Sequence, residues 1–137
     1  MRAVAIALDA LGDTTALWHD WLAEAHRRYR VDVADLDEQL ANWRALLQRF
    51  AEERAPVYLR PDADVSAVLR RLQASGARVG VFADAPEELA RVALSQLGAV
   101  RRVELLETGP DALVRLRAKL GGDVRVVESR SQLLSLR

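Results

Sequence analysis

The 137-residue sequence has no cysteine, so disulfide bonds and thiol chemistry are excluded. It has a single lysine, Lys119, and its other basic residues are arginine. Basic and acidic residues are equal in number, at 20 each, and no basic run exceeds two residues, so nucleic-acid binding is not indicated. No apolar run approaches the roughly 20 residues of a membrane-spanning helix.

The remaining composition is that of an ordinary globular protein, with 50% hydrophobic and 29% charged residues. A chain of this length can bury a core, and one domain over residues 1–137 is expected. The first residues, Met-Arg-Ala-Val, run into a predicted strand without the apolar region and cleavage site of a signal peptide. A cytoplasmic location is therefore the default expectation.

The stretch at residues 3–14 organises the chain. Residues 3–8 form an apolar run that ends in turn residues, which is typical of a buried strand. Ligand sites in open α/β sheets lie beyond the carboxyl ends of such strands. Asp9 is therefore the candidate catalytic residue, and the alternative is a turn or cap aspartate. Asp13 or Thr14 is expected to cap the helix that follows.

Two amphipathic helices are predicted next, the first ending near Tyr29 and the second covering about 35–54. The second has a 4-3-4-3 apolar stripe that consists of Leu36, Leu40, Trp43, Leu47 and Phe50. We expect the helices to form an antiparallel pair within a cap insertion at 15–57. Trp18, Trp21 and Trp43 are expected to pack between them, and the alternatives are a ligand pocket or an interface with a protein partner or a second copy.

Helices and strands alternate from residue 60 onward. Helices are predicted at about 60–76, 84–98, 110–120 and 131–136, and strands at 78–82, 100–106 and 123–127. This alternation implies right-handed crossovers and a parallel sheet of four strands. The predicted fold class is α/β, with helices on both faces of the sheet.

Two stretches carry a family resemblance. One runs from Leu59-Arg60-Pro61-Asp62-Ala63-Asp64-Val65 to Val81, and the other from Pro86-Glu87-Glu88-Leu89 to Leu97-Gly98. They resemble the segments around the second motif of the haloacid dehalogenase-like (HAD-like) superfamily of hydrolases. The resemblance implies a three-layer, Rossmann-like sheet in the order 4-1-2-3, with the first strand central and a small two-helix cap.

The resemblance also implies a nucleophilic aspartate at the end of the first strand, and two registers are open. In the ungapped register, Leu8-Asp9-Ala10-Leu11-Gly12 resembles the dehalogenase branch, and Asp9 is the nucleophile. This register is favoured because it keeps Gly12, which would let the backbone turn sharply. In the gapped register Asp9 takes the place of a second aspartate, and Ala7 holds the nucleophile position.

The other three motif positions lack the groups that the family uses. Ala83 stands where a hydroxyl is usual, and residues 107–111 have no lysine. Lys119 lies about three helical turns further on. Glu128 is displaced by one residue from the magnesium-binding acids, and Arg130 would be unwelcome beside that metal. No cofactor is expected, and magnesium stays open as an alternative that these replacements disfavour.

Phosphoryl transfer depends on positioned charges of this kind. The chain is therefore predicted to be a catalytically degenerate HAD-like protein that binds a ligand or a protein. Two alternatives stay open. One is a divergent hydrolase, of phosphatase or dehalogenase type, that uses Asp9 as nucleophile. The other is a homodimeric structural module built through the cap helices.

Four further side chains are candidate binding residues, namely Asp13, Asp84, Glu128 and Arg130. The acids could join Asp9 around a divalent cation, and Arg130 could hold a substrate carboxylate. The simpler interpretation is that Asp84 caps the helix beginning near Pro86 and that Glu128 is solvated.

Overall fold

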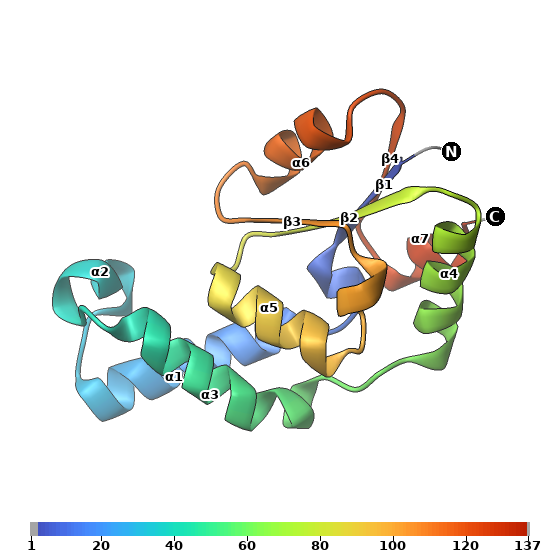
Figure 1. The fold of residues 1–137 in the computed structure, drawn as a ribbon. Helices are drawn as coiled ribbons and strands as arrows, with labels where there is room; N and C mark the ends of the chain where they lie inside the picture. The colour runs from blue at the N-terminus through green and yellow to red at the C-terminus, as the bar shows by residue number, and fades with distance from the viewer. Residues whose placement is uncertain (1–2, 137) are drawn as a thin grey trace.

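The computed structural model describes residues 3–136, in which four strands form one parallel sheet (Figure 1). The strands are β1 (Ala3–Ala7), β2 (Arg78–Ala83), β3 (Leu105–Thr108) and β4 (Val124–Val127). Their order is β3-β2-β1-β4, which confirms the predicted topology with the first strand central. In register, Ile6 of β1 is paired with Val81 of β2 and with Val127 of β4.

Helices cover both faces of the sheet, as a three-layer α/β fold requires. They are α4 (Ala63–Ala74), α5 (Glu87–Gln96), α6 (Ala112–Leu120) and α7 (Arg130–Leu134). Figure 1 shows α6 on one face and α4, α5 and α7 on the other. Because successive side chains of a strand point to opposite faces, Ala3 and Ala5 pack against α6, while Val4 and Ile6 enter the larger core.

Small residues line the part of the sheet that lies beneath Leu116 of α6. A Cβ atom on Gly80 would lie 2.6 Å from Cδ1 of Leu116, the buried leucine with which α6 contacts the sheet. The absence of side-chain bulk at Gly80, together with Ala3 and Ala5, therefore sets how closely α6 approaches.

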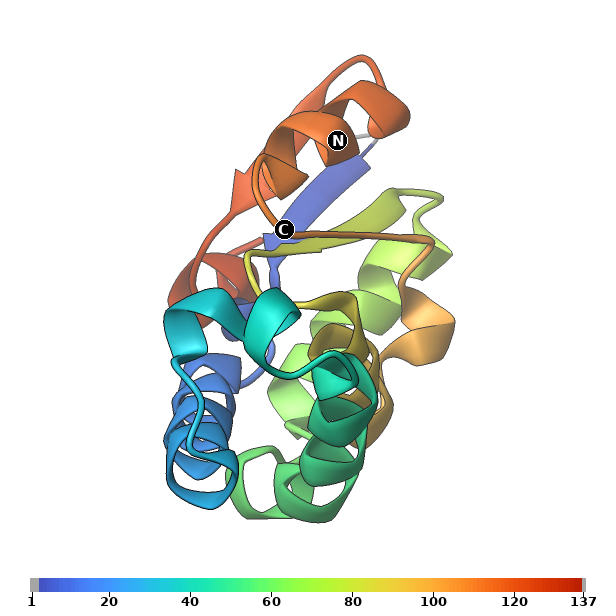
Figure 2. The same cartoon turned by 90° about the vertical axis from the view of Figure 1, so that its left-hand side faces the viewer.

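The helical insertion is built from α1 (Thr14–Tyr29) and α3 (Trp43–Tyr58), which run in opposite directions and lie side by side in both views (Figures 1 and 2). The antiparallel pair is thus confirmed. The rings of Trp21 and Phe50 meet between the two helices, with their centroids 5.5 Å apart.

The prediction of one continuous helix over 35–54 is wrong. The chain forms a 3-10 turn, η2 (Val33–Asp35), then the short α2 (Leu36–Gln39), and resumes as α3. The break is at Leu40, whose backbone leaves the helical region, with φ −144° and ψ 87°. Leu40 still packs against the core, so the side chains of the predicted apolar stripe reach the core although the helix is interrupted.

The third strand begins later than predicted. Residues Val100–Arg102 form a 3-10 turn, η3, and β3 starts at Leu105. Pairing toward β2 begins just before this point, where the Glu104 N–H donates to the Val79 carbonyl at 2.8 Å. Val100 and Val103, which suggested an earlier strand, lie in and directly after this turn, and Val100 is 55% exposed.

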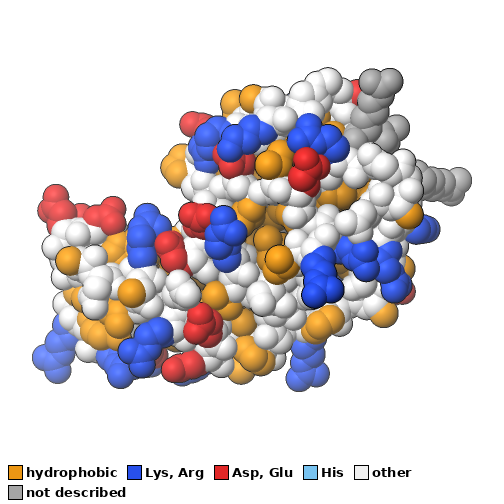
Figure 3. All heavy atoms as spheres, viewed as in Figure 1, with side chains coloured by type: hydrophobic (Ala, Val, Ile, Leu, Met, Phe, Trp, Pro, Cys, Tyr) orange, Lys and Arg blue, Asp and Glu red, His pale blue; other side chains and the backbone are white. Residues whose placement is uncertain are grey.

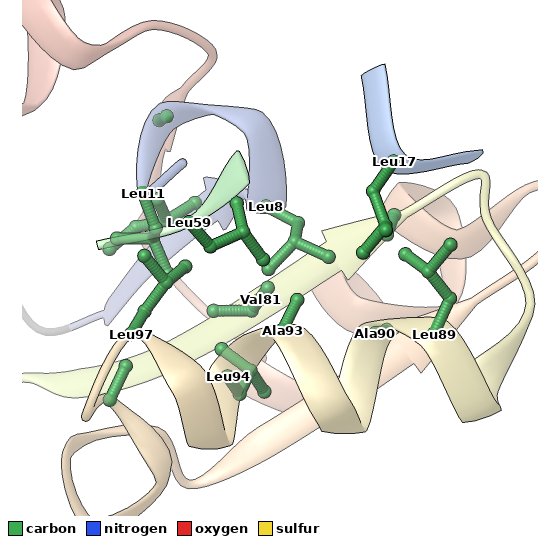
Figure 4. Packing of buried hydrophobic residues seen from close by; sticks show 14 of the residues in the cluster. Leu8, Leu11, Leu17, Leu59, Val81, Leu89, Ala90, Ala93, Leu94 and Leu97 are labelled. Atoms are coloured by element: carbon green, nitrogen blue, oxygen red, sulfur yellow. The ribbon is translucent and has the colours of Figure 1, made fainter. Parts of the chain in front are cut away.

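The insertion and the sheet share one hydrophobic core. Figure 4 shows Leu17 of α1 beside Leu89 of α5, and Leu59 beside Leu11 and Leu97. Gly12 lies at this junction, where an added Cβ would be 3.0 Å from side-chain atoms of Leu59 and Leu97. Its φ lies outside the left-handed region, so close packing, and not a sharp turn, requires this glycine.

Within residues 3–136, no helix combines the length and apolar character that crossing a membrane requires.

Candidate functional site

A pocket of about 790 Å³ opens where β1, β2 and β3 end. This volume falls in the range of small-molecule sites. Its walls come from the turn after β1, the start of α1, the end of β2 and the start of α6. The lining residues include Asp9, Thr14, Thr15, Trp18, His19, Phe82, Ala83, Asp84, Asp111, Leu113 and Val114.

Asp9 lies in a 3-10 turn, η1 (Leu8–Ala10), directly after β1. One carboxylate oxygen accepts hydrogen bonds from the Thr14 N–H, at 3.1 Å, and from the Thr14 hydroxyl. The other accepts from the Thr15 hydroxyl at 2.8 Å. Unpaired N–H groups and the positive end of the dipole favour a carboxylate at a helix start. Asp9 therefore ties the turn after β1 to the first turn of α1.

Asp84 also lines the pocket, but its predicted role as a cap is wrong. The residue that caps α5 is Pro86, with no side-chain hydrogen bond. Pro86 has an extended backbone, with φ −61° and ψ 150°, so the helix begins only after it. Asp84 therefore stands two residues before the cap position. Among residues 3–136, no hydrogen bond or ion pair engages its carboxylate, which is exposed at the pocket.

Asp111 is a third acid in the pocket. It is the N-cap residue of α6, in the left-handed region at φ 59° and ψ 23°, and its side chain makes no capping hydrogen bond. Asp tolerates this conformation better than most residues with a side chain. Its carboxylate, like that of Asp84, is not used by the helix that it precedes.

Asp13, Glu128 and Arg130 lie outside the pocket lining. Asp13 caps α1, as predicted, by accepting from the Ala16 N–H at 3.1 Å. The Glu128 side chain is exposed, as the simpler interpretation expects. The structure therefore brings Asp9 and Asp84 to one pocket and leaves the other three candidates elsewhere.

Arg130 is engaged at the start of α4. Its Nε donates to Oδ2 of Asp62 at 2.8 Å, and Asp62 in turn caps α4. This bond from Arg130, with the N–H groups of Val65 and Asp64, holds the pKa of Asp62 below its usual value. The guanidinium thus has a structural partner away from the pocket.

The only lysine is also occupied outside the pocket. Lys119 pairs with Glu107 at 3.1 Å, and Arg115 pairs with the same carboxylate at 3.2 Å. The bonds from Lys119 and Arg115 lower the pKa of Glu107. Lys119 therefore does not supply the lysine that the HAD-like resemblance would place beside Asp9.

Sequence reasoning did not single out Thr14, Thr15 and Asp111 as site residues. Asp111 was detectable in principle, because it follows the third strand, and strand ends meet at one edge of a parallel sheet. The threonine hydroxyls carried no such signal, since their contact with Asp9 depends on how sharply the chain folds between β1 and α1.

The pocket residues do not match a magnesium site. Both oxygens of Asp9 already accept hydrogen bonds from Thr14 and Thr15. In the described part of the chain, no three His, Asp or Glu side chains gather closely enough to hold a metal ion. Magnesium requires near-octahedral oxygen ligands.

The three tryptophans have different environments. Trp21 and Trp43 are buried, and the Trp43 Nε1–H donates to Asp37 at 2.7 Å. These two side chains fill the core, so a partner surface on the cap helices would use other residues. Trp18 is half-buried and lines the pocket, which is one of the roles considered from sequence.

No family model and no curated protein matches the chain. A solved structure does, described as "putative beta-phosphoglucomutase" from Thermotoga maritima. The match has a TM-score of 0.57 at 18% identity and covers 92% of this chain and 75% of that one. At this identity the likeness shows the fold alone. Together with the sheet order, it shows a Rossmann-like α/β fold, consistent with the fold that the HAD-like resemblance implies.

Proposed function

We propose that this chain is a HAD-like protein that has lost phosphoryl-transfer activity and binds a small ligand in the pocket at the strand ends. The observation that carries the proposal is the state of Asp9. Both of its oxygens accept hydrogen bonds from Thr14 and Thr15 of the adjoining helix, so the carboxylate acts as a structural clamp.

The charge of the pocket supports the same proposal. Transfer of a phosphoryl group spreads negative charge over the phosphoryl oxygens, and catalytic sites offset this charge with cations. Among the described residues, no arginine or lysine lines this pocket, while Asp9, Asp84 and Asp111 do. A bound phosphate would therefore face three carboxylates, and His19 is the one basic side chain among the described lining residues.

Hydrolysis of p-nitrophenyl phosphate in the presence of magnesium tests the proposal. We expect no turnover by the wild type above that of an Asp9→Asn variant. Asp13→Asn is the matched control, because Asp13 supports the same helix without lining the pocket. Turnover that is lost in Asp9→Asn and kept in Asp13→Asn would contradict the proposal.

A divergent hydrolase with Asp9 as nucleophile is the second candidate function. It is favoured by the position of Asp9, which is exposed and lines an open pocket directly after β1. Displacement of halide by a carboxylate needs no metal. Release of chloride from 2-chloropropionate, abolished by Asp9→Asn, would establish this alternative.

A further inference from the structure

The three carboxylates of the pocket have no cationic partners in the described part of the chain. Acidic and basic residues are equal in number, at 20 each, and eight of the acids within residues 3–136 form ion pairs with arginine or lysine. Over α3 and α5, acidic and basic side chains lie interspersed (Figure 3), including the pairs Arg44–Glu88 and Arg91–Glu87. Within residues 3–136, none of the three pocket aspartates forms an ion pair.

Two of these aspartates are also unused locally. Aspartates at helix starts commonly cap the helix, as Asp13 and Asp62 do here. Asp84 and Asp111 precede α5 and α6, and neither carboxylate bonds to its helix. Asp111 also keeps a left-handed backbone, which carries a conformational cost in a residue with a side chain. Their charge is therefore available to a ligand.

Much of the wall between the acids is apolar, and the polar side chains of Thr14, Thr15 and His19 also line it. Trp18 from α1 and Phe82 from β2 are half-buried, and Leu113 and Val114 come from α6. Val114 is 67% exposed, a high value for a large aliphatic side chain at a pocket. An aromatic face attracts a cation within about 6 Å of its centroid, and carboxylates add to this attraction.

We propose that the ligand of this pocket is an organic cation, an ammonium group carried on an apolar or aromatic body. The ammonium lies toward Asp84 and Asp111, and the body packs against Trp18 and Phe82. This inference rests on the proposed function, because it names the ligand class of the same pocket.

Titration of the ¹⁵N-labelled full chain, followed by NMR, tests this with three probes of similar shape. They are phenethylammonium, the neutral 2-phenylethanol and the anionic 3-phenylpropionate. We expect the cation to shift the amide signals of residues 82–85 and 109–114. We expect its affinity to exceed that of either other probe by about tenfold, since the pocket offers both charge and aromatic surface.

Variants that remove one carboxylate charge test whether the cation binds beside Asp84 and Asp111. Asp84→Asn and Asp111→Asn keep the side-chain shape, and asparagine tolerates the left-handed backbone at position 111. Each is expected to weaken phenethylammonium binding about two- to fivefold, with a larger loss in the double variant. Asp123→Asn is the control, because it makes the same change in net charge at an exposed residue outside the pocket.

The inference is overturned if phenethylammonium does not bind at a concentration of about 10 mM, at which a site with a millimolar dissociation constant would be mostly occupied. It is also overturned if the neutral or anionic probe binds as tightly, or if the double variant binds like the wild type. The proposed function fails by a different result, Asp9-dependent turnover, which leaves the titration unaffected.

Discussion

Replacing Asp9 by alanine separates a structural clamp from a catalytic group. Asp9 accepts hydrogen bonds from Thr14 and Thr15, whereas Asp13 accepts one from Ala16 at the same helix start. Asp9→Ala and Asp13→Ala therefore remove two supports of α1, and only the first of these residues lines the pocket.

The two variants should differ in stability. Loss of an N-cap costs about 1 kcal/mol, which is the expectation for Asp13→Ala. Asp9→Ala also leaves the Thr14 hydroxyl, on a residue only 4% exposed, without its acceptor. An unsatisfied buried group costs about 1–3 kcal/mol, so we expect Asp9→Ala to lower the free energy of unfolding by about 2 kcal/mol. Each kcal/mol corresponds to about 4 °C in Tm for a domain of this size.

Urea unfolding monitored by far-ultraviolet circular dichroism measures both losses. Asp9→Asn should lie between the wild type and Asp9→Ala, because its amide oxygen still accepts from Thr14 while its NH₂ group cannot accept from Thr15. The reasoning is refuted if Asp9→Ala is no less stable than the control Asp123→Ala. It is also refuted if Asp9→Ala keeps full stability and abolishes a measurable turnover.

Three further outcomes follow from the packing and the ion pairs. Leu116→Ala should cost about 2–5 kcal/mol in urea unfolding, because Leu116 is fully buried in the small cluster beneath α6; a loss below about 1 kcal/mol would mean that α6 packs differently. Gly12→Ala should cost about 1–3 kcal/mol through overpacking against Leu59 and Leu97, and an unchanged or higher unfolding midpoint would contradict this. The bond from Arg130 lowers the pKa of Asp62, so its contribution is complete above the unfolded pKa of about 3.9 and is lost as the pH falls through the folded pKa. The stability difference between the wild type and Asp62→Asn should therefore be larger at pH 6 than at pH 3, and a difference that grows toward low pH would exclude this linkage.

Local patterns predicted most elements because the cause of each lies within a few residues. Residues 3–8 are apolar and end in turn residues, and the amphipathic run that follows Asp62 forms α4. The second cap helix shows where such patterns are insufficient. Leu40 and Trp43 satisfy the apolar stripe on either side of a break, because burial requires that side chains reach the core and does not require one continuous helix.

The composition of the pocket followed from the sequence only in part. Asp9 and Asp84 were located at the strand ends because parallel strands place their carboxyl ends at one edge. Arg130 was a candidate for the same site, but it follows the edge strand β4 and pairs with Asp62 of the neighbouring α4.

The sequence pattern predicted the α/β class, and the resemblance to the HAD-like superfamily supplied the strand order. The sequence also has alanine at position 83 and no lysine in residues 107–111. Contacts between elements established the rest. Thr14 and Thr15 donate hydrogen bonds to the Asp9 carboxylate, and the carboxylates of Asp84 and Asp111 line one pocket without capping α5 or α6. The physical reason is that backbone preference and burial act over short stretches of chain. The partner of a polar side chain depends instead on which segments the folded sheet brings within hydrogen-bonding distance.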